Sequence, residues 1–137
     1  MRVKLLDIPD LLLEESSLWK VKVLSINNKE PALVELLRWK RTERNNYNKI
    51  IKAIKLASTV PRVSDKKKVK KSANASHGEV YEFRADKSHA RLLFFYDKDE
   101  TLIICTNHFW KGKGSQDAAF SRCNQMMKVY YGERKKQ

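Results

Sequence analysis

The stretch of sequence that decides the fold runs from Glu79 to Phe109 and reads EVYEFRADKSHARLLFFYDKDETLIICTNHF. It holds apolar segments separated by short polar turns, a pattern typical of strands joined by tight connections. We expect three consecutive strands, at residues 79–85, 90–97 and 102–109. The pattern predicts an antiparallel sheet, and the register of its hairpins decides which side chains share a face.

The first hairpin is expected to turn between Lys87 and Ser88, which places Arg84 opposite Arg91. The alternate face then carries only apolar side chains and is expected to face the core: Tyr81, Phe83 and Ala85 opposite Phe94, Leu92 and Ala90. Like charges directly opposite each other destabilise a sheet. An anion bound between the two arginines would remove this penalty.

The second hairpin extends the arginine-bearing face. We expect Tyr96 to pair with Thr101. This register puts Thr106 opposite Arg91, with His108 just beyond it on the same face. One end of this face would therefore combine guanidinium and imidazole groups.

Two lysines, Lys111 and Lys113, follow the third strand, and each is followed by a glycine. The backbone of such a loop can approach a phosphate closely. Together with the arginines and the histidine, these lysines predict a phosphodiester-binding site. The alternative for each residue alone is an ordinary surface role, such as a salt bridge between Arg84 and Glu82.

The flanking segments supply one more strand and three helices. Residues 18–26 alternate apolar and polar side chains and predict a strand. Pro31 suits the first turn of a helix. Apolar side chains then recur at helical spacing to about Ser58, with a polar joint at residues 42–46, and residues 116–131 form a final helix. The fold class is α+β: a helical hairpin packed on an antiparallel sheet of about four strands, plus a C-terminal helix.

The chain of 137 residues suits one domain, residues 1–137, and carries a formal net charge of +13. No ordinary fold needs this imbalance, which favours a polyanionic partner, either nucleic acid or an anionic membrane. No segment predicts a helix that is basic on one face and apolar on the other, so nucleic acid is preferred. The C-terminal tail, residues 132–137, is charged.

A basic segment with few large apolar residues runs from residue 61 to residue 76. We interpret it as a basic loop. We expect RNA contacts from its lysines: Lys66, Lys67, Lys68, Lys70 and Lys71. The alternative is a solvated linker.

The sequence excludes several classes of protein. The longest clean apolar run, residues 92–96, is far too short to span a membrane. Asp7, Pro9 and Asp10 interrupt the leucine-rich N-terminus, so we expect no secretion signal and a cytoplasmic location. Two cysteines and three separated histidines, without a Cys-x-x-Cys, His-Glu-x-x-His or P-loop motif, predict no metal site and no cofactor.

Three linked motifs resemble the RelE/ParE superfamily of bacterial type II toxins, most closely its phage-derived HigB-like branch. They are Tyr81-Glu82-Phe83-Arg84, Ala90-Arg91-Leu92-Leu93-Phe94-Phe95 and Thr106-Asn107-His108-Phe109-Trp110-Lys111. The resemblance covers residues 78–131. The sequence departs from the family at Gly112, where a second lysine is usual, and it lacks the family's Thr-Pro start of the last helix.

The resemblance implies a RelE-like, microbial-RNase-like fold and a metal-independent endoribonuclease that cuts messenger RNA on the ribosome. In such enzymes the ribose 2′-hydroxyl attacks the adjacent phosphate, which requires a base, an acid and positive charge. Arg84 and Arg91 would then hold the phosphate. His108 would be the general acid or base, and Lys111 would be the family's basic residue, with Lys113 as a substitute for the missing second lysine. The implied partner is a helix-turn-helix antitoxin, and no small-molecule cofactor is implied.

Two other functions fit the same residues. Relatives similar to ParE inhibit DNA gyrase and cleave no RNA, and a non-catalytic basic nucleic-acid-binding protein could keep the fold. The net charge of +13 agrees with all three functions. A test of cleavage on translated messenger RNA separates the first function from the other two.

Overall fold

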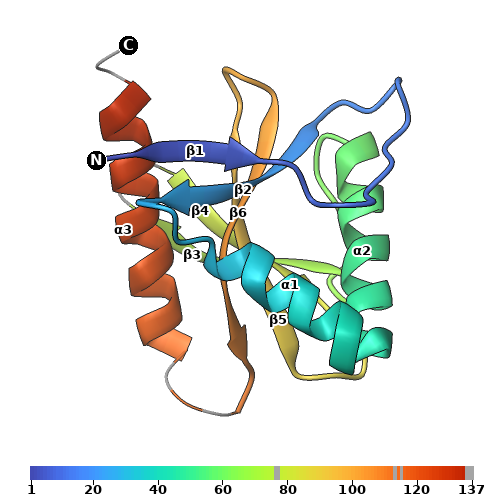
Figure 1. Ribbon diagram of the computed structural model, residues 1–137. Helices are drawn as coiled ribbons and strands as arrows, with labels where there is room; N and C mark the ends of the chain where they lie inside the picture. The colour runs from blue at the N-terminus through green and yellow to red at the C-terminus, as the bar shows by residue number, and fades with distance from the viewer. Residues whose placement is uncertain (76–77, 113, 115, 135–137) are drawn as a thin grey trace.

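A six-stranded sheet with helices on both faces forms the fold (Figure 1). The computed structural model describes residues 1–75, 78–112, 114 and 116–134. The elements in chain order are β1 (Val3–Leu6), β2 (Lys20–Ile26), α1 (Pro31–Thr42), α2 (Arg44–Thr59), β3 (Val69–Ala75), β4 (Gly78–Arg84), β5 (Ala90–Asp97), β6 (Leu102–Trp110) and α3 (Gln116–Arg134). These elements confirm the α+β class and the helical hairpin followed by a C-terminal helix.

The strands lie in the order β1-β2-β6-β5-β4-β3. Strand β2 runs parallel to β6, and the other neighbouring pairs are antiparallel. The expectation of an antiparallel sheet of about four strands was therefore wrong, because the sheet has six strands and is mixed. A parallel pair needs a crossover connection, and the helical hairpin α1–α2 begins the crossover from β2 to β6.

The two strands that the sequence analysis missed are the edges of the sheet. Strand β3 pairs only with β4, and β1 pairs only with β2. The interpretation of residues 61–76 as a loop was thus wrong for Val69–Ala75. An edge strand tolerates lysines, since one side of its backbone is unpaired, and the charges of Lys70 and Lys71 discourage pairing with another chain. The polar composition of β3 therefore resembles that of a loop.

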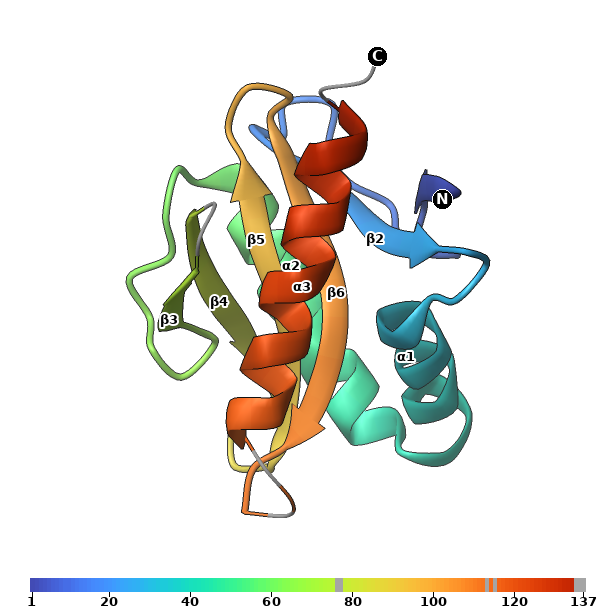
Figure 2. The ribbon, with the colours of Figure 1, turned by 90° about the vertical axis from the view of Figure 1, so that its left-hand side faces the viewer.

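Each face of the sheet has its own core. Helices α1 and α2 cover the face that carries Phe83, Leu92 and Phe94, which confirms the expected apolar face. Helix α3 covers the opposite face, where its Met127 packs with Leu93 in a second cluster. Figure 2 shows α3 lying over β5 and β6, while β3 and β4 extend to one side of it. None of the helices in the described part of the chain has both the length and the apolar character that crossing a membrane requires.

The two hairpins differ in how well the sequence predicted their register. The pairing of Arg84 with Arg91 between β4 and β5 is confirmed. Between β5 and β6 the expected register was wrong, because Tyr96 pairs with Ile103. A β-bulge then shifts the register where β6 passes Leu93, and an extra residue on one strand moves every following side chain to the other face.

Candidate anion-binding site

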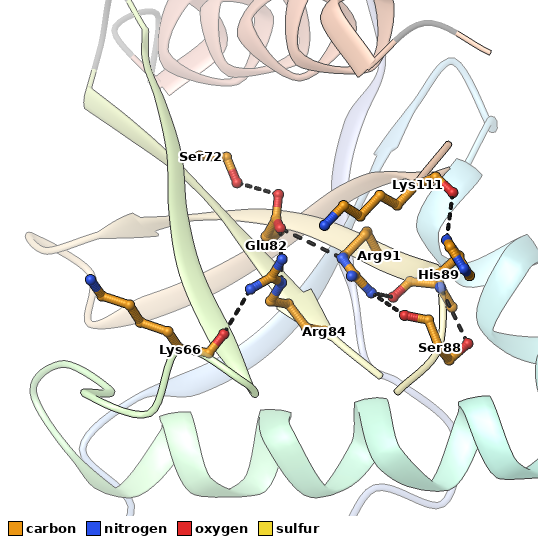
Figure 3. Close-up of polar contacts among 9 residues, drawn as sticks. Lys66, Ser72, Glu82, Arg84, Ser88, His89, Arg91 and Lys111 are labelled. Carbon is orange, nitrogen blue, oxygen red and sulfur yellow. Dashed lines mark hydrogen bonds and ion pairs between the residues drawn. The ribbon is translucent and has the colours of Figure 1, made fainter. Parts of the chain in front are cut away.

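A pair of arginines and a buried glutamate form the centre of the candidate site (Figure 3). Strands β4 and β5 bring Arg84 and Arg91 together as Cα partners. The Nε atom of Arg84 lies 3.2 Å from Oε1 of Glu82, and the Nε atom of Arg91 lies 3.6 Å from the same oxygen. The side chain of Glu82 is only 5% exposed. The protein therefore supplies its own anion to the arginine pair, which offsets the repulsion expected from the sequence.

Two N–H groups of the arginine pair can still donate hydrogen bonds. The Nε atoms of Arg84 and Arg91 are buried and have no hydrogen-bond partner among the described residues, because their contacts with Glu82 are ion pairs without hydrogen-bond geometry. A buried donor without an acceptor costs free energy. An anion with several oxygens, such as a phosphate, is the kind of ligand that satisfies such donors.

The loop before β3 fixes the remaining contacts of Arg84 and Glu82. The Nη1 atom of Arg84 donates to the carbonyl oxygen of Lys66 at 2.9 Å. The hydroxyl of Ser72, on β3, donates to Oε2 of Glu82 at 2.5 Å. Arg84 is thereby held by the loop before β3, and Glu82 is held by β3 itself. Arg84 remains 18% exposed, so solvent reaches it.

Arg91 has a more buried position than Arg84. Its side chain is 7% exposed, and its Nη1 donates to the carbonyl oxygens of Ser88 and Ala90 at 2.8 and 2.9 Å. Burial lowers the pKa of Arg91, and repulsion by Arg84 lowers it further, while Glu82 raises it. Arg91 therefore ties the turn between β4 and β5 to the site and presents less of its charge to solvent than Arg84 does.

Three lysines surround the arginine pair on the same face. Lys70 is the Cα partner of Glu82, and the backbone oxygen of Lys68 accepts the backbone N–H of Arg84 at 2.8 Å. Lys111 lies two positions beyond Phe109, the Cα partner of Arg91, and Figure 3 shows its side chain extending in the direction of Glu82. We call this surface the arginine face; it comprises Lys68, Lys70, Glu82, Arg84, Arg91 and Lys111.

His89 also lies on this face, and the sequence analysis did not select it. The backbone N–H of Lys111 donates to the carbonyl oxygen of His89 at 2.8 Å, so the two residues lie opposite each other. The Nδ1 atom of His89 lies 2.8 Å from the carbonyl oxygen of Lys111 (Figure 3). The available signal was its position, because side chains two residues apart on a strand share a face and His89 precedes Arg91 by two.

His108 lies on the opposite face of the sheet. It is the Cα partner of Leu92, and its Nε2 atom lies 3.0 Å from Oε2 of Glu35 on α1. Burial lowers the pKa of His108, although the carboxylate of Glu35 raises it. The expectation that His108 joins the arginines was therefore wrong, and the bulge in β6 is the cause. Thr106 is also displaced, since Phe109 and not Thr106 is the partner of Arg91.

A cleft of about 400 Å³ lies beside the edge strand β3. Its lining residues include three of the lysines expected to bind RNA together with an arginine and two tyrosines: Lys66, Lys70, Lys71, Arg62, Tyr81 and Tyr96. The guanidinium carbon of Arg62 lies 4.0 Å from the centre of the Tyr96 ring. Cationic side chains next to aromatic rings are typical of surfaces that bind single-stranded nucleic acid.

The remaining lysines of the prediction have separate positions. Lys67 is exposed, and its backbone N–H donates to the side chain of Asp65. Lys71 projects from the other face of β3 and lies 3.0 Å from Glu79. Lys113 lies outside the described residues. The structure thus groups Lys68, Lys70 and Lys111 with the arginines, and places Lys66 at their edge through its carbonyl.

Among the described residues, no group of three or more histidine, cysteine, aspartate or glutamate side chains has the arrangement needed to hold a metal ion. Cys105 and Cys123 are both buried and unpaired. Burial raises the pKa of both thiols. The described side chains on the arginine face carry guanidinium, ammonium, imidazole and carboxylate groups.

Comparisons with known proteins agree with this fold. A search of curated proteins gives no match. Among solved structures, the chain is similar to an archaeal RelE–RelB complex from Pyrococcus horikoshii OT3, with 13% identity and a TM-score of 0.51 over 71% of this chain and 99% of that chain. Residues 37–124 match the family of the phage-derived protein Gp49-like. Since this match spans more than half of the sequence, the chain belongs to the phage-derived Gp49-like family.

Proposed function

We propose that this protein is the toxin of a type II toxin–antitoxin pair and acts as a metal-independent endoribonuclease on messenger RNA at the ribosome. The observation that carries the proposal is the arginine face, on which Arg84 and Arg91 lie between lysines with unsatisfied Nε donors. The RelE-like fold supports the same conclusion.

The chemistry of RNA cleavage requires positive charge at the phosphate. Attack by the 2′-hydroxyl produces a phosphorane with more negative charge than the substrate, and preorganised cations stabilise it. Arg84, which solvent reaches, contacts the phosphate, while the more buried Arg91 supports it from below. Lys111 and Lys70 supply further charge at the two sides of the pair. Lys113, which lies outside the described residues, stays a proposed RNA-binding residue.

The edge strand and the cleft beside it extend the contact with RNA. Lys66 and Lys70 line the cleft together with Tyr81 and Tyr96, which belong to the face covered by α1 and α2, so the cleft would carry the cationic surface from the arginine face around the edge strand. Phosphate contacts of this kind add affinity that depends on salt and carries no sequence preference. We infer that Lys67, Lys68 and Lys71 contribute to the same ribosome or RNA contact.

The proposed partner is a helix-turn-helix antitoxin with an acidic segment that covers the arginine face. The structural relative was solved as a RelE–RelB complex. A net charge of +13 favours an acidic partner, because complementary charge speeds association and selects the partner.

A second candidate function has one observation in its favour. The side chain of Arg91 is only 7% exposed and donates hydrogen bonds to two carbonyl oxygens. Such contacts are typical of an arginine with a structural role. A protein that binds nucleic acid through the arginine face without cleaving it agrees with this arrangement.

Primer extension on a messenger RNA translated in a purified system tests the proposal. We expect the wild-type protein to produce cleavage sites, and Arg84→Ala to lose cleavage by a factor of about 10² or more while it melts close to the wild-type temperature. Lys52→Ala, on the solvent side of α2, is the control for a charge lost elsewhere. Binding without cleavage by the wild-type protein would support the second candidate, and inhibited supercoiling by DNA gyrase would replace both.

A further inference from the structure

We propose that His89 is the general base of the cleavage, taking the proton from the attacking 2′-hydroxyl. This inference rests on the proposed function. It assigns to the turn between β4 and β5 the role that the sequence analysis gave to His108.

His89 lies just before β5, at the end of the arginine face. His89 and Lys111 face each other across β5 and β6, and Arg91 and Phe109 are the next such pair on the same face. The imidazole therefore lies at the end of the arginine face, against the backbone carbonyl of Lys111 and two positions before Arg91 along the chain. The ammonium of Lys111 extends away from the ring in the direction of Glu82 (Figure 3). His89 is exposed, so a substrate bound on this face can reach it.

The hydrogen bond of His89 defines its tautomer. A carbonyl oxygen only accepts hydrogen bonds, so the contact between Nδ1 and the oxygen of Lys111 at 2.8 Å requires the hydrogen on Nδ1. In the neutral ring this leaves the lone pair on Nε2. A histidine held in this way by a backbone carbonyl has the arrangement of a general base, since one nitrogen fixes the ring and the other accepts the proton.

The surroundings restrict the ring further. The rings of His89 and Trp110 lie 6.3 Å apart with planes inclined by 22°. Gly112 adopts a φ of +84°, which side chains rarely adopt, and it turns the chain directly after the carbonyl that binds Nδ1. The departure from the family pattern at position 112 therefore lies next to the proposed base.

His108 differs from His89 in its face of the sheet and in its hydrogen bonds. Its Nε2 contacts Glu35, its Nδ1 is buried without a hydrogen-bond partner among the described residues, and its ring lies edge-on to Trp39 of the helical hairpin. Among the described residues, His89 is thus the histidine on the arginine face, and His108, the histidine of the family motif, lies on the opposite face.

The proposed step is the attack of the 2′-hydroxyl on the neighbouring phosphate. Nε2 of His89 accepts the proton of the 2′-hydroxyl, while the 2′ oxygen forms a bond to phosphorus. The bond between phosphorus and the 5′ oxygen breaks, and the 5′ oxygen takes its electron pair and a proton from water. The products are a 2′,3′-cyclic phosphate and a 5′-hydroxyl, with His89 left protonated until it releases the proton to solvent.

The test compares His89→Asn with His108→Gln in single-turnover cleavage over a range of pH. The amide introduced by the first substitution can still donate to the Lys111 oxygen, and the amide introduced by the second can still reach Glu35. We expect His89→Asn to lower the rate by about 10²–10⁴ and to abolish the rise of rate with pH, without a change in affinity for an uncleavable 2′-O-methyl RNA. His108→Gln keeps the pH dependence of the wild-type protein.

Nitrogen NMR of the histidine rings supplies a readout besides activity, and neutral His89 is expected to carry its hydrogen on Nδ1. Cleavage by His89→Asn at the wild-type rate, or a hydrogen on Nε2 in the neutral ring, would overturn the assignment and leave the proposed function intact. A folded wild-type protein that binds RNA but never cleaves it would instead remove the proposed function, and the general base with it.

Discussion

The carboxylate of Glu82 lies within ion-pair distance of both arginines and accepts a hydrogen bond from Ser72. The sequence predicted Arg84 and Arg91 as a repulsive pair that a bound anion would relieve, with a salt bridge between Arg84 and Glu82 as the alternative. The structure shows that an internal carboxylate relieves part of the repulsion, so the site is stable without a ligand and keeps two unsatisfied Nε donors.

We predict that Glu82→Gln destabilises the fold by about 2 kcal/mol, because removing one partner leaves a buried charge without compensation. For a domain of this size, the melting temperature falls by about 6 °C. Added inorganic phosphate is expected to restore more of the melting temperature of the variant than of the wild-type protein. Equal shifts in both proteins would show that the arginines bind no anion in place of Glu82.

A separate prediction concerns His108 and acid. Burial lowers its pKa in the folded protein, so the unfolded chain binds the proton more readily and stability falls as the pH drops below the ordinary range of histidine. His108→Gln removes this contribution. Denaturant unfolding at neutral pH and at pH 5 is expected to show a smaller acid loss for the variant than for the wild-type protein. A loss of the same size in both would exclude His108 as a source of acid sensitivity.

The strands with the most buried side chains were the easiest to predict from the sequence. Strands β4, β5 and β6 have apolar faces set by the core, and their positions were predicted from the sequence to within about a residue. The β-bulge in β6 was not predictable, because Thr106 and Asn107 are polar yet buried, and their hydrogen bonds to Cys123 and Ala119 depend on α3. That single irregularity decided which histidine joined the arginines.

The edge strands were missed for a different reason. Strand β3 buries Val69 but exposes Lys70 and Lys71, so its pattern is weaker than that of a central strand. Strand β1 has only four residues and pairs with β2 alone. Short or charged edge strands gain their structure from the neighbouring strand, and a window of sequence does not contain that neighbour.

Strand β3 allows a matched comparison of two lysines. Lys70 lies on the arginine face, whereas Lys71 pairs with Glu79 on the other face. We predict that Lys70→Ala weakens binding of single-stranded RNA and lowers the magnitude of the salt slope of log Kd by about 0.7, the value for one phosphate contact. Lys71→Ala is expected to change the slope less. Filter binding at several salt concentrations measures both, and the reverse order would place the RNA on the opposite face.

At the scale of the whole molecule, the net charge of +13 controls how fast the protein associates with charged partners. We predict that a complex with the proposed acidic antitoxin forms rapidly at low salt and that the association rate falls by a factor of about 10 or more between 50 mM and 500 mM salt. The dissociation rate is expected to change much less. Stopped-flow fluorescence measures both rates, and an association rate that is independent of salt would mean that the partner docks on an uncharged surface.

The parallel pairing of β2 with β6 has a consequence for how the protein is made. Strand β2 ends at Ile26, and its partner begins at Leu102, so the ribosome must synthesise all of the chain between them before the central sheet can close. At ordinary rates of translation this interval is on the order of several seconds. Until then the β1–β2 hairpin lacks its inner neighbour, and the nascent chain cannot complete the domain. The central sheet therefore closes only after β6 has been synthesised, which gives a partner made earlier time to be present when the arginine face first forms.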